Sequence, residues 1–137
     1  MHGANLGTLH RSCDAAGACL CVPRLPWVPE ALARGSTLRR PSCVHWVGEP
    51  SGWLSAQRAS GSRIVGVELA EAATRLADLA PARQRTIVVL GHERTGIPAE
   101  VRDLLGEAVE IPMLGSGTSL NVAVAGSLVL YKLAGLL

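Results

Sequence analysis

Short runs of apolar, often β-branched residues alternate along the chain with segments whose apolar residues recur at helical spacing. The runs predict strands at residues 18–22, 43–47, 63–68, 86–90 and 108–112. The other segments predict helices at residues 5–16, 30–34, 51–58, 98–105 and 119–137, and a mixture of helix and loop at 70–85. Strands that alternate with helices are typical of an α/β fold, in which a mainly parallel sheet carries helices on both faces.

The segment 119–137 is the longest of these helices, and its apolar residues cover almost every face. A helix that is apolar all round must be buried, whether in the domain core, in a subunit interface or in a bilayer. Its length reaches the lower limit for spanning a membrane, but Asn121, Ser127 and Lys132 interrupt it. We therefore expect no membrane anchor, and a dimer that buries this helix.

Two of the strands end in loops that contain glycine. Residues 91–96 follow the strand at 86–90, and residues 113–118 follow the strand at 108–112. Neighbouring parallel strands bring their carboxyl ends to one edge of a sheet, where α/β proteins bind ligands, so we expect both loops at one site. Ser119 should start the last helix there, because a serine side chain can accept hydrogen bonds from backbone N–H groups one turn ahead.

The same region carries a family resemblance. The segments LGHERTGIP (residues 90–98), IPM (111–113) and SLNVAVA (119–125) resemble, in order and spacing, motifs two and three of the SpoU class of SPOUT RNA ribose 2′-O-methyltransferases. The start of the first predicted helix, Asn5-Leu6-Gly7, together with Arg11, resembles motif one of that family.

This resemblance implies features of the fold that periodicity does not predict. It implies a single SPOUT methyltransferase domain over residues 1–137, with a deep C-terminal trefoil knot in which the last helix threads a loop. It also implies a homodimer, with the last helix and the motif-one helix in the interface. The family normally has a strand just before its motif-one Asn, but only four residues precede Asn5, so we expect that the first strand is missing or that the chain is truncated.

The implied activity is the S-adenosylmethionine-dependent methylation of a ribose 2′-hydroxyl in tRNA or rRNA. The resemblance implies that the cofactor is contacted mainly by main-chain groups around Val67, Gly91, Ile111 and Leu120. A glycine at position 91 suits this role, because a residue without Cβ allows a ligand to approach the backbone closely.

The resemblance also implies roles for polar residues around that pocket. Glu93 would be an orienting, hydrogen-bonding carboxylate, and Asn121 and Ser119 would cap the last helix or position the substrate. Asn5 and Arg11 would contact the target nucleotide. Arg11 could help remove the hydroxyl proton or could anchor a phosphate with its guanidinium fork, and the sequence leaves both roles open.

Composition adds little to the choice of function. At 137 residues the chain is one domain long, and 48% apolar against 3% aromatic residues predicts a core of Val, Leu, Ile and Ala. The formal net charge is +2, and residues 1–66 carry seven arginines against three acidic residues, so this half is the better candidate for contact with a polyanion. Arg34, Arg39 and Arg40 lie in one predicted loop, either solvated or in contact with an RNA backbone.

The four cysteines, Cys13, Cys19, Cys21 and Cys43, lack the paired C-x-x-C spacing that is typical of a zinc site. They fall within predicted helix and strand segments. We therefore interpret them as reduced core residues of a cytoplasmic protein, and we expect no metal. The first residues also lack the pattern of a secretory signal.

Two other function classes compete with an RNA methyltransferase. One is a catalytically silent RNA-binding paralogue that acts as a homodimeric binding module; the presence of Asn5, Arg11, Glu93, Ser119 and Asn121 speaks against it. The other is a dinucleotide-dependent oxidoreductase, which is excluded because no G-x-G-x-x-G follows an early strand with an acidic residue about 20 positions later. Without an additional N-terminal RNA-binding domain, the resemblance favours a tRNA over an rRNA substrate.

Overall fold

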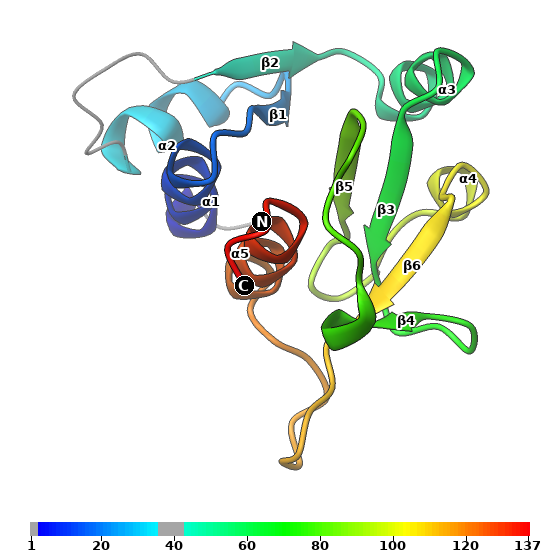
Figure 1. The fold of residues 1–137 in the computed structure, drawn as a ribbon. Helices are drawn as coiled ribbons and strands as arrows, with labels where there is room; N and C mark the ends of the chain where they lie inside the picture. The colour runs from blue at the N-terminus through cyan, green and yellow to red at the C-terminus, as the bar shows by residue number, and fades with distance from the viewer. Residues whose placement is uncertain (1–2, 36–42) are drawn as a thin grey trace.

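A computed structural model describes residues 3–35 and 43–137 (Figure 1). The helices are α1 (Gly3–Ala15), α2 (Val28–Gly35), α3 (Pro50–Ala59), α4 (Ala99–Arg102) and α5 (Val122–Leu133), with a 3-10 turn η1 (Leu76–Asp78). The strands are β1 (Leu20–Pro23), β2 (Val44–Val47), β3 (Arg63–Val67), β4 (Thr74–Arg75), β5 (Thr86–Leu90) and β6 (Glu107–Glu110). Among these residues, no helix has both the length and the apolar character needed to cross a membrane.

Every strand pairing is parallel, which confirms the predicted α/β fold. The strands nevertheless form two sheets instead of one. A four-stranded sheet has the order β4-β6-β3-β5, and a separate pair joins β1 to β2. The separate pair lies beside α1 and α2, and the chain leads from β2 to α3 along the top of the view (Figure 1).

Helices cover both faces of the four-stranded sheet, as the alternation along β3 requires. Ile64 packs on one face with residues of α3 and α4, whereas Val65 packs on the other with Val129 and Leu133 of α5. A third cluster is formed mainly by residues of α1, α2 and β1, which pack against one another. The core is accordingly aliphatic, as the composition predicts.

Helix α5 differs from the prediction at its start and is partly exposed. It begins after Asn121, not at Ser119, because the Asn121 side chain accepts hydrogen bonds from the backbone N–H groups of Ala123 and Val124. Val122, Ala123 and Val129 are buried, but Val124 is 47% exposed. A single chain therefore leaves part of the helix uncovered, and its burial in a dimer stays a prediction.

Helices α1 and α5 lie side by side, and this contact positions the start of α1. Gly126 sits at the crossing, where an added Cβ would lie 2.6 Å from Leu90 and 2.9 Å from Leu9. Next to it, the hydroxyls of Ser12 and Ser127 are 2.7 Å apart and share a hydrogen bond. A glycine at this crossing lets α5 approach both α1 and β5 closely.

Three other expectations need correction. Residues 70–85 form β4, η1 and connecting loops, because pairing with β6 and burial of Leu79 override their helix-forming composition. The helix predicted at 98–105 is limited to α4. Arg34 lies in the last turn of α2 and pairs with Glu30, whereas Arg39 and Arg40 lie outside the described residues.

The cysteines also differ from the prediction. Cys13 is buried, as expected, and burial together with the nearby Cys21 raises the pKa of its thiol to about 11. Cys21 is exposed. Cys19 and Cys43 form a disulfide on the exposed side of the β1–β2 pair. The reason is that this small sheet has an uncovered face, which a single sheet with helices on both faces would lack.

Candidate functional site

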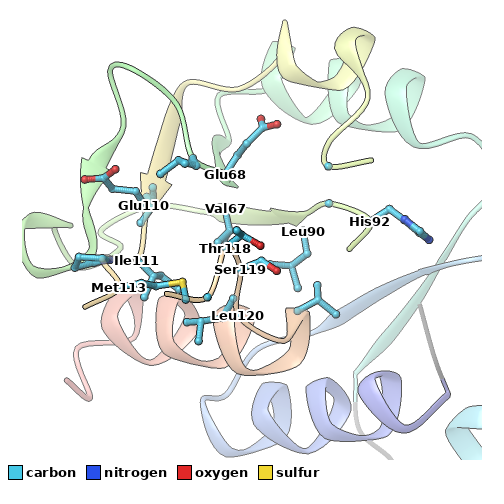
Figure 2. A pocket seen from close by; sticks show the side chains of 18 residues that line it. Val67, Glu68, Leu90, His92, Glu110, Ile111, Met113, Thr118, Ser119 and Leu120 are labelled. Atoms are coloured by element: carbon cyan, nitrogen blue, oxygen red, sulfur yellow. The ribbon is translucent and has the colours of Figure 1, made fainter. Parts of the chain in front are cut away.

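A cavity of about 660 Å³ lies at the carboxyl ends of β3, β5 and β6. Val67, Gly91, Ile111 and Leu120 all line it (Figure 2). The register explains why: Val67 pairs with Leu90 on β5 and with Val109 on β6, so three strands end at the same level of one edge. The two predicted loops therefore converge as expected.

The first loop, His92–Gly96, folds back on itself. His92 and Gly96 exchange backbone hydrogen bonds of 3.0 and 2.8 Å, and Arg94 N–H donates to Nδ1 of His92 at 3.2 Å. Gly96 has φ of 69°, a conformation that favours glycine. The loop thus holds Glu93 in place before any ligand arrives.

Gly91 serves this loop and not the close approach of a ligand. An added Cβ would lie 2.5 Å from the carbonyl carbon of Gly96 and 2.7 Å from the nitrogen of Ile97. Both neighbours are backbone atoms, which cannot move aside like a side chain. The physical reason given for Gly91 from the sequence is therefore wrong, although the residue does line the cavity.

Asn121, Asn5 and Glu93 form a hydrogen-bonded set, which we call the polar triad. Nδ2 of Asn121 donates to Oδ1 of Asn5 at 3.0 Å, and Nδ2 of Asn5 donates to Oε1 of Glu93 at 2.7 Å. These residues come from the starts of α5 and α1 and from the first loop. Three residues selected by family resemblance thus meet in space, across sequence separations of 88 and 116.

The backbone of α5 sets the orientation of every amide in the triad. Because Oδ1 of Asn121 accepts from the N–H groups of Ala123 and Val124, its Nδ2 must face Asn5. Oδ1 of Asn5 is then an acceptor, so Nδ2 of Asn5 must donate to Glu93. Asn5 is 8% exposed, which strengthens these bonds relative to bonds in water. In the triad, Oε1 of Glu93 accepts the hydrogen bond from Asn5, and Oε2 of Glu93 accepts none from the described residues.

Two carboxylates that were not selected from the sequence also line the cavity. Glu68 follows β3 and lies 3.9 Å from Arg102, and Glu110 ends β6 and lies 3.5 Å from Arg75. The walls between them are mostly apolar and include Met113 (Figure 2). Their positions at the carboxyl ends of two strands were the available signal. An apolar cavity with acidic groups is suited to a partly apolar ligand that carries positive charge.

Ser119 and Arg11 lie apart from the triad. Ser119 is exposed and lines the cavity beside Thr118. Arg11 is exposed on α1 and makes no hydrogen bond or ion pair with the described residues. Six helical residues separate it from Asn5, which places the two roughly 120° apart around the axis. The structure therefore brings Asn5 to the triad but not Arg11.

Comparison with known sequences points to one family. A sequence model of the SpoU rRNA Methylase family matches residues 1–131. The 23S rRNA (uridine(2479)-2′-O)-methyltransferase of Streptomyces viridochromogenes is 33% identical over 135 residues, which cover 93% of this chain and 47% of the relative. The chain spans about half the length of such curated relatives.

Solved structures give the same result for the fold. The A. aeolicus TrmH/SpoU tRNA modifying enzyme superposes with a TM-score of 0.81 at 25% identity, over 99% of this chain and 70% of that one. The SpoU methyltransferase AviRb from Streptomyces viridochromogenes, in complex with the cofactor AdoMet, superposes with a TM-score of 0.75 at 30% identity, over 98% and 56%.

Proposed function

Because the chain belongs to the SpoU rRNA methylase family, we propose that it is an enzyme that methylates a ribose 2′-hydroxyl in tRNA or rRNA with S-adenosylmethionine. The observation that carries this proposal is the polar triad beside the cavity. A carboxylate oriented by two amides lies next to a pocket large enough for a nucleoside-sized ligand. The intact triad also argues against a catalytically silent RNA-binding paralogue.

The lining of the cavity fits S-adenosylmethionine. Val67, Ile111 and Leu120 supply apolar surface for an adenosine moiety, and Glu68 and Glu110 supply carboxylate oxygens that can accept hydrogen bonds from the ligand. The cofactor, when bound, supplies an electrophilic methyl group on a sulfonium. The named structure of AviRb with AdoMet supports the choice of this cofactor.

The polar triad would hold the ribose. The unbonded Oε2 of Glu93 can accept a hydrogen bond from a substrate hydroxyl, and Asn5 holds that carboxylate in place through Oε1. Asn121 keeps Asn5 in the required orientation while it caps α5. Orientation of this kind lowers the barrier by bringing the reacting oxygen into line before reaction.

Arg11, Asn5 and Ser119 would contact the RNA. Arg11 is exposed, and the planar fork of its guanidinium can bind a phosphate with two parallel hydrogen bonds. Transfer of the cofactor's methyl group to the 2′-oxygen would require loss of the hydroxyl proton. Arg11 would assist that proton loss together with the bound phosphate, or would only anchor the phosphate.

We propose that the C-terminal part of the chain forms the deep trefoil knot of the family. Helix α5 is held between the four-stranded sheet and the segment after η1, because Leu79 packs with Val129 and Leu133. At the end of α5, the N–H of Ala82 donates to the carbonyl oxygen of Leu133 at 2.7 Å. A segment that crosses α5 in this way is consistent with threading of the helix through a loop.

We also propose a homodimer that covers the exposed side of α5. Leu120, Val124, Leu136 and Leu137 are between 38% and 64% exposed, at the ends of α5 and on its outer side. Burying such apolar area is favourable. Each chain of the dimer would contribute one SPOUT domain. We propose that the dimer is located in the cytoplasm and that tRNA is its preferred substrate.

Two measurements test the proposed function. Calorimetry should show S-adenosylmethionine binding to the protein without RNA, at one site per chain. Mass spectrometry of RNA from cells that lack the gene should show the loss of one ribose methylation. Binding without a missing methyl group would favour the silent paralogue. The absence of both cofactor binding and a missing methyl group would contradict the proposal.

A further inference from the structure

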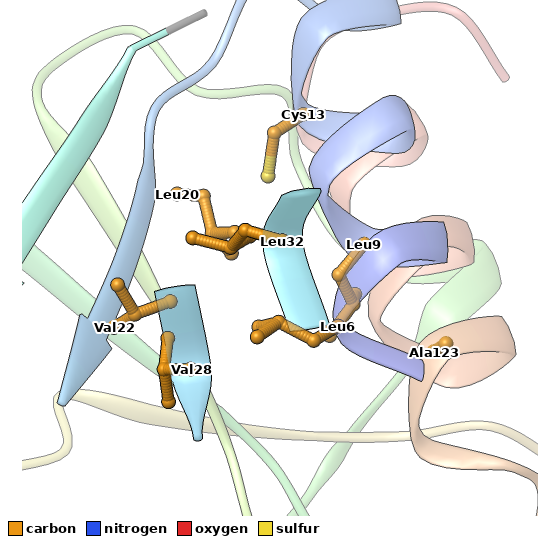
Figure 3. Close-up of a cluster of buried hydrophobic side chains, with 8 residues drawn as sticks. All are labelled: Leu6, Leu9, Cys13, Leu20, Val22, Val28, Leu32 and Ala123. Atoms are coloured by element: carbon orange, nitrogen blue, oxygen red, sulfur yellow. The ribbon is translucent and has the colours of Figure 1, made fainter. Parts of the chain in front are cut away.

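The exposed face of the β1–β2 pair carries a group of sulfur and imidazole side chains that lies away from the cavity. In β1, Leu20 and Val22 point into the cluster between α1 and α2 (Figure 3), so Cys21 faces the other way. Leu20 pairs with Val44 in the register. Cys19 and Cys43 precede these partners and are therefore neighbours on the two strands.

Three ligand atoms of this face are close together. Cys19 and Cys43 are joined as a disulfide, with their Cα atoms 4.6 Å apart, and Nε2 of His45 lies 3.3 Å from Sγ of Cys43. The two sulfurs and a ring nitrogen of His45 all lie within 4.8 Å of one another, and all three residues are exposed. Around a tetrahedral zinc ion, sulfur and nitrogen ligands would be roughly 3.5–3.8 Å apart, given metal–ligand distances of about 2.3 and 2.0–2.1 Å.

We propose that, when the Cys19–Cys43 disulfide is reduced, Cys19, Cys43 and His45 bind a zinc-class divalent cation, with water as the fourth ligand. Thiolate and imidazole ligands select such soft or borderline cations over Mg²⁺ and Ca²⁺. The disulfide and the cation exclude each other, because both require the same two sulfur atoms. The face is therefore a metal site in its reduced form and a covalent link in its oxidised form.

The backbone already holds the three ligands near one another. Leu20 N–H donates to the carbonyl oxygen of Cys43 at 2.9 Å, and the ladder continues to Pro23 and Val47. Reduction consumes two electrons and two protons from a small dithiol and leaves two thiols on neighbouring strands. Cation binding then releases thiol protons to solvent. An exposed disulfide is accessible to such a reductant, and cytoplasmic thiols keep most cysteines reduced.

The test uses Co²⁺ as a spectroscopic substitute for zinc on the full chain. Protein reduced with a small dithiol, then freed of it without air, should bind one Co²⁺ with a thiolate-to-cobalt charge-transfer band. The oxidised protein should show no such band. His45→Ala keeps both cysteines and changes an exposed residue, so it should fold normally and bind Co²⁺ at least about tenfold more weakly.

Cys21→Ser is the matched control, because Cys21 lies on the same strand outside the three-atom group. It should bind Co²⁺ as the parent does. Zn²⁺ should also raise the melting temperature of the reduced parent, but not that of His45→Ala. The proposal is overturned if the reduced parent gives no charge-transfer band, if His45→Ala binds as tightly as the parent, or if Cys21→Ser loses binding as well.

Discussion

The two loops that border the cavity are built in opposite ways. His92–Gly96 is closed by its own backbone hydrogen bonds, and Gly91 packs directly against its far end. Residues 112–120 are exposed at every position, and Leu114 is fully exposed. Within the described chain, no backbone hydrogen bond outside helices and strands involves these residues.

This difference separates two tasks at one site. The closed loop holds Glu93, for which we propose a role in orienting the substrate, and connects it to α1 through Asn5. The open loop supplies apolar groups such as Met113 and Leu120, which line the cavity and are partly exposed in the single chain. Preorganisation is thus concentrated where hydrogen-bond geometry matters, because only a fixed donor or acceptor can orient a reacting group.

Of the variants that test this difference between the two loops, we expect Gly91→Val to have the largest effect. The new side chain would overlap the backbone of Gly96 and Ile97, and overpacking of this kind costs about 1–3 kcal/mol or more. We expect a lower melting temperature and no calorimetric binding of S-adenosylmethionine. Gly115→Val is the control in the open loop, since nothing lies within 4 Å of its Cβ position. If both variants bind and melt like the parent, the closed loop is not the rigid half of the site.

Variants of Arg11 test whether turnover depends on a residue outside both loops. Arg11→Ala should keep cofactor affinity and lose turnover by a factor on the order of 10²–10⁴ if proton removal is its task. Arg11→Lys retains a charge for a phosphate but loses the fork, so it separates the two roles. Single-turnover methylation at saturating RNA, measured across pH, is the assay. A rate near that of the parent for Arg11→Ala would mean that the role belongs to another residue.

Asn121 and Ser119 form a matched pair at the junction of the open loop and α5. Asn121→Ala removes the helix cap, at a cost of about 0.5–2 kcal/mol, and leaves Asn5 without its donor. We expect lower stability in urea and turnover reduced about tenfold, which corresponds to about 1.4 kcal/mol. Ser119→Ala should leave stability unchanged. Equal losses of stability in the two variants would show that the cap is assigned to the wrong residue.

The smallest expected effect lies at the opposite edge of the sheet, where Arg63 is 2.6 Å from Glu107. Partial burial favours a higher pKa for Glu107, but hydrogen bonds from Arg63 and Thr74 outweigh it and lower the pKa. A lowered pKa means that the pair stabilises the fold above the unfolded value of about 4.3, and that this contribution, about 1 kcal/mol or less, is lost as pH falls through the folded value. Denaturation of Glu107→Gln across acidic pH should show a shallower loss of stability than the parent. Identical profiles would contradict the assignment.

The sequence predicted those parts of the fold that local pattern determines. The strand Thr86–Leu90 appears with the predicted bounds, because an unbroken β-branched run before a glycine leaves little alternative. Residues 70–85 are different, since their helix formers are overridden by pairing with β6, a partner distant in sequence. The outward cysteines were missed because periodicity does not reveal that β1 and β2 form a sheet of their own.

The candidate site shows a similar limit. Pattern alone placed two glycine loops at one sheet edge, but the polar triad was found through family motifs, because no local signal links Asn5 to Glu93 or Asn121. The reason given for Gly91 failed for the same physical cause. Whether a missing Cβ faces a ligand or the backbone of the same loop depends on the loop's own path, which the spacing of residues does not specify.

The polar triad also has a consequence for biosynthesis. Asn5 emerges from the ribosome before its donor Asn121, which follows 116 residues later. At about 5–20 residues per second, translation of that interval takes roughly 6–23 seconds. During this time α1 has neither its neighbour α5 nor the amide that orients Asn5. A nascent chain that lacks Asn121 therefore cannot complete the polar triad, and the hydrogen-bonded arrangement of Glu93 arises only after the start of α5 has been made.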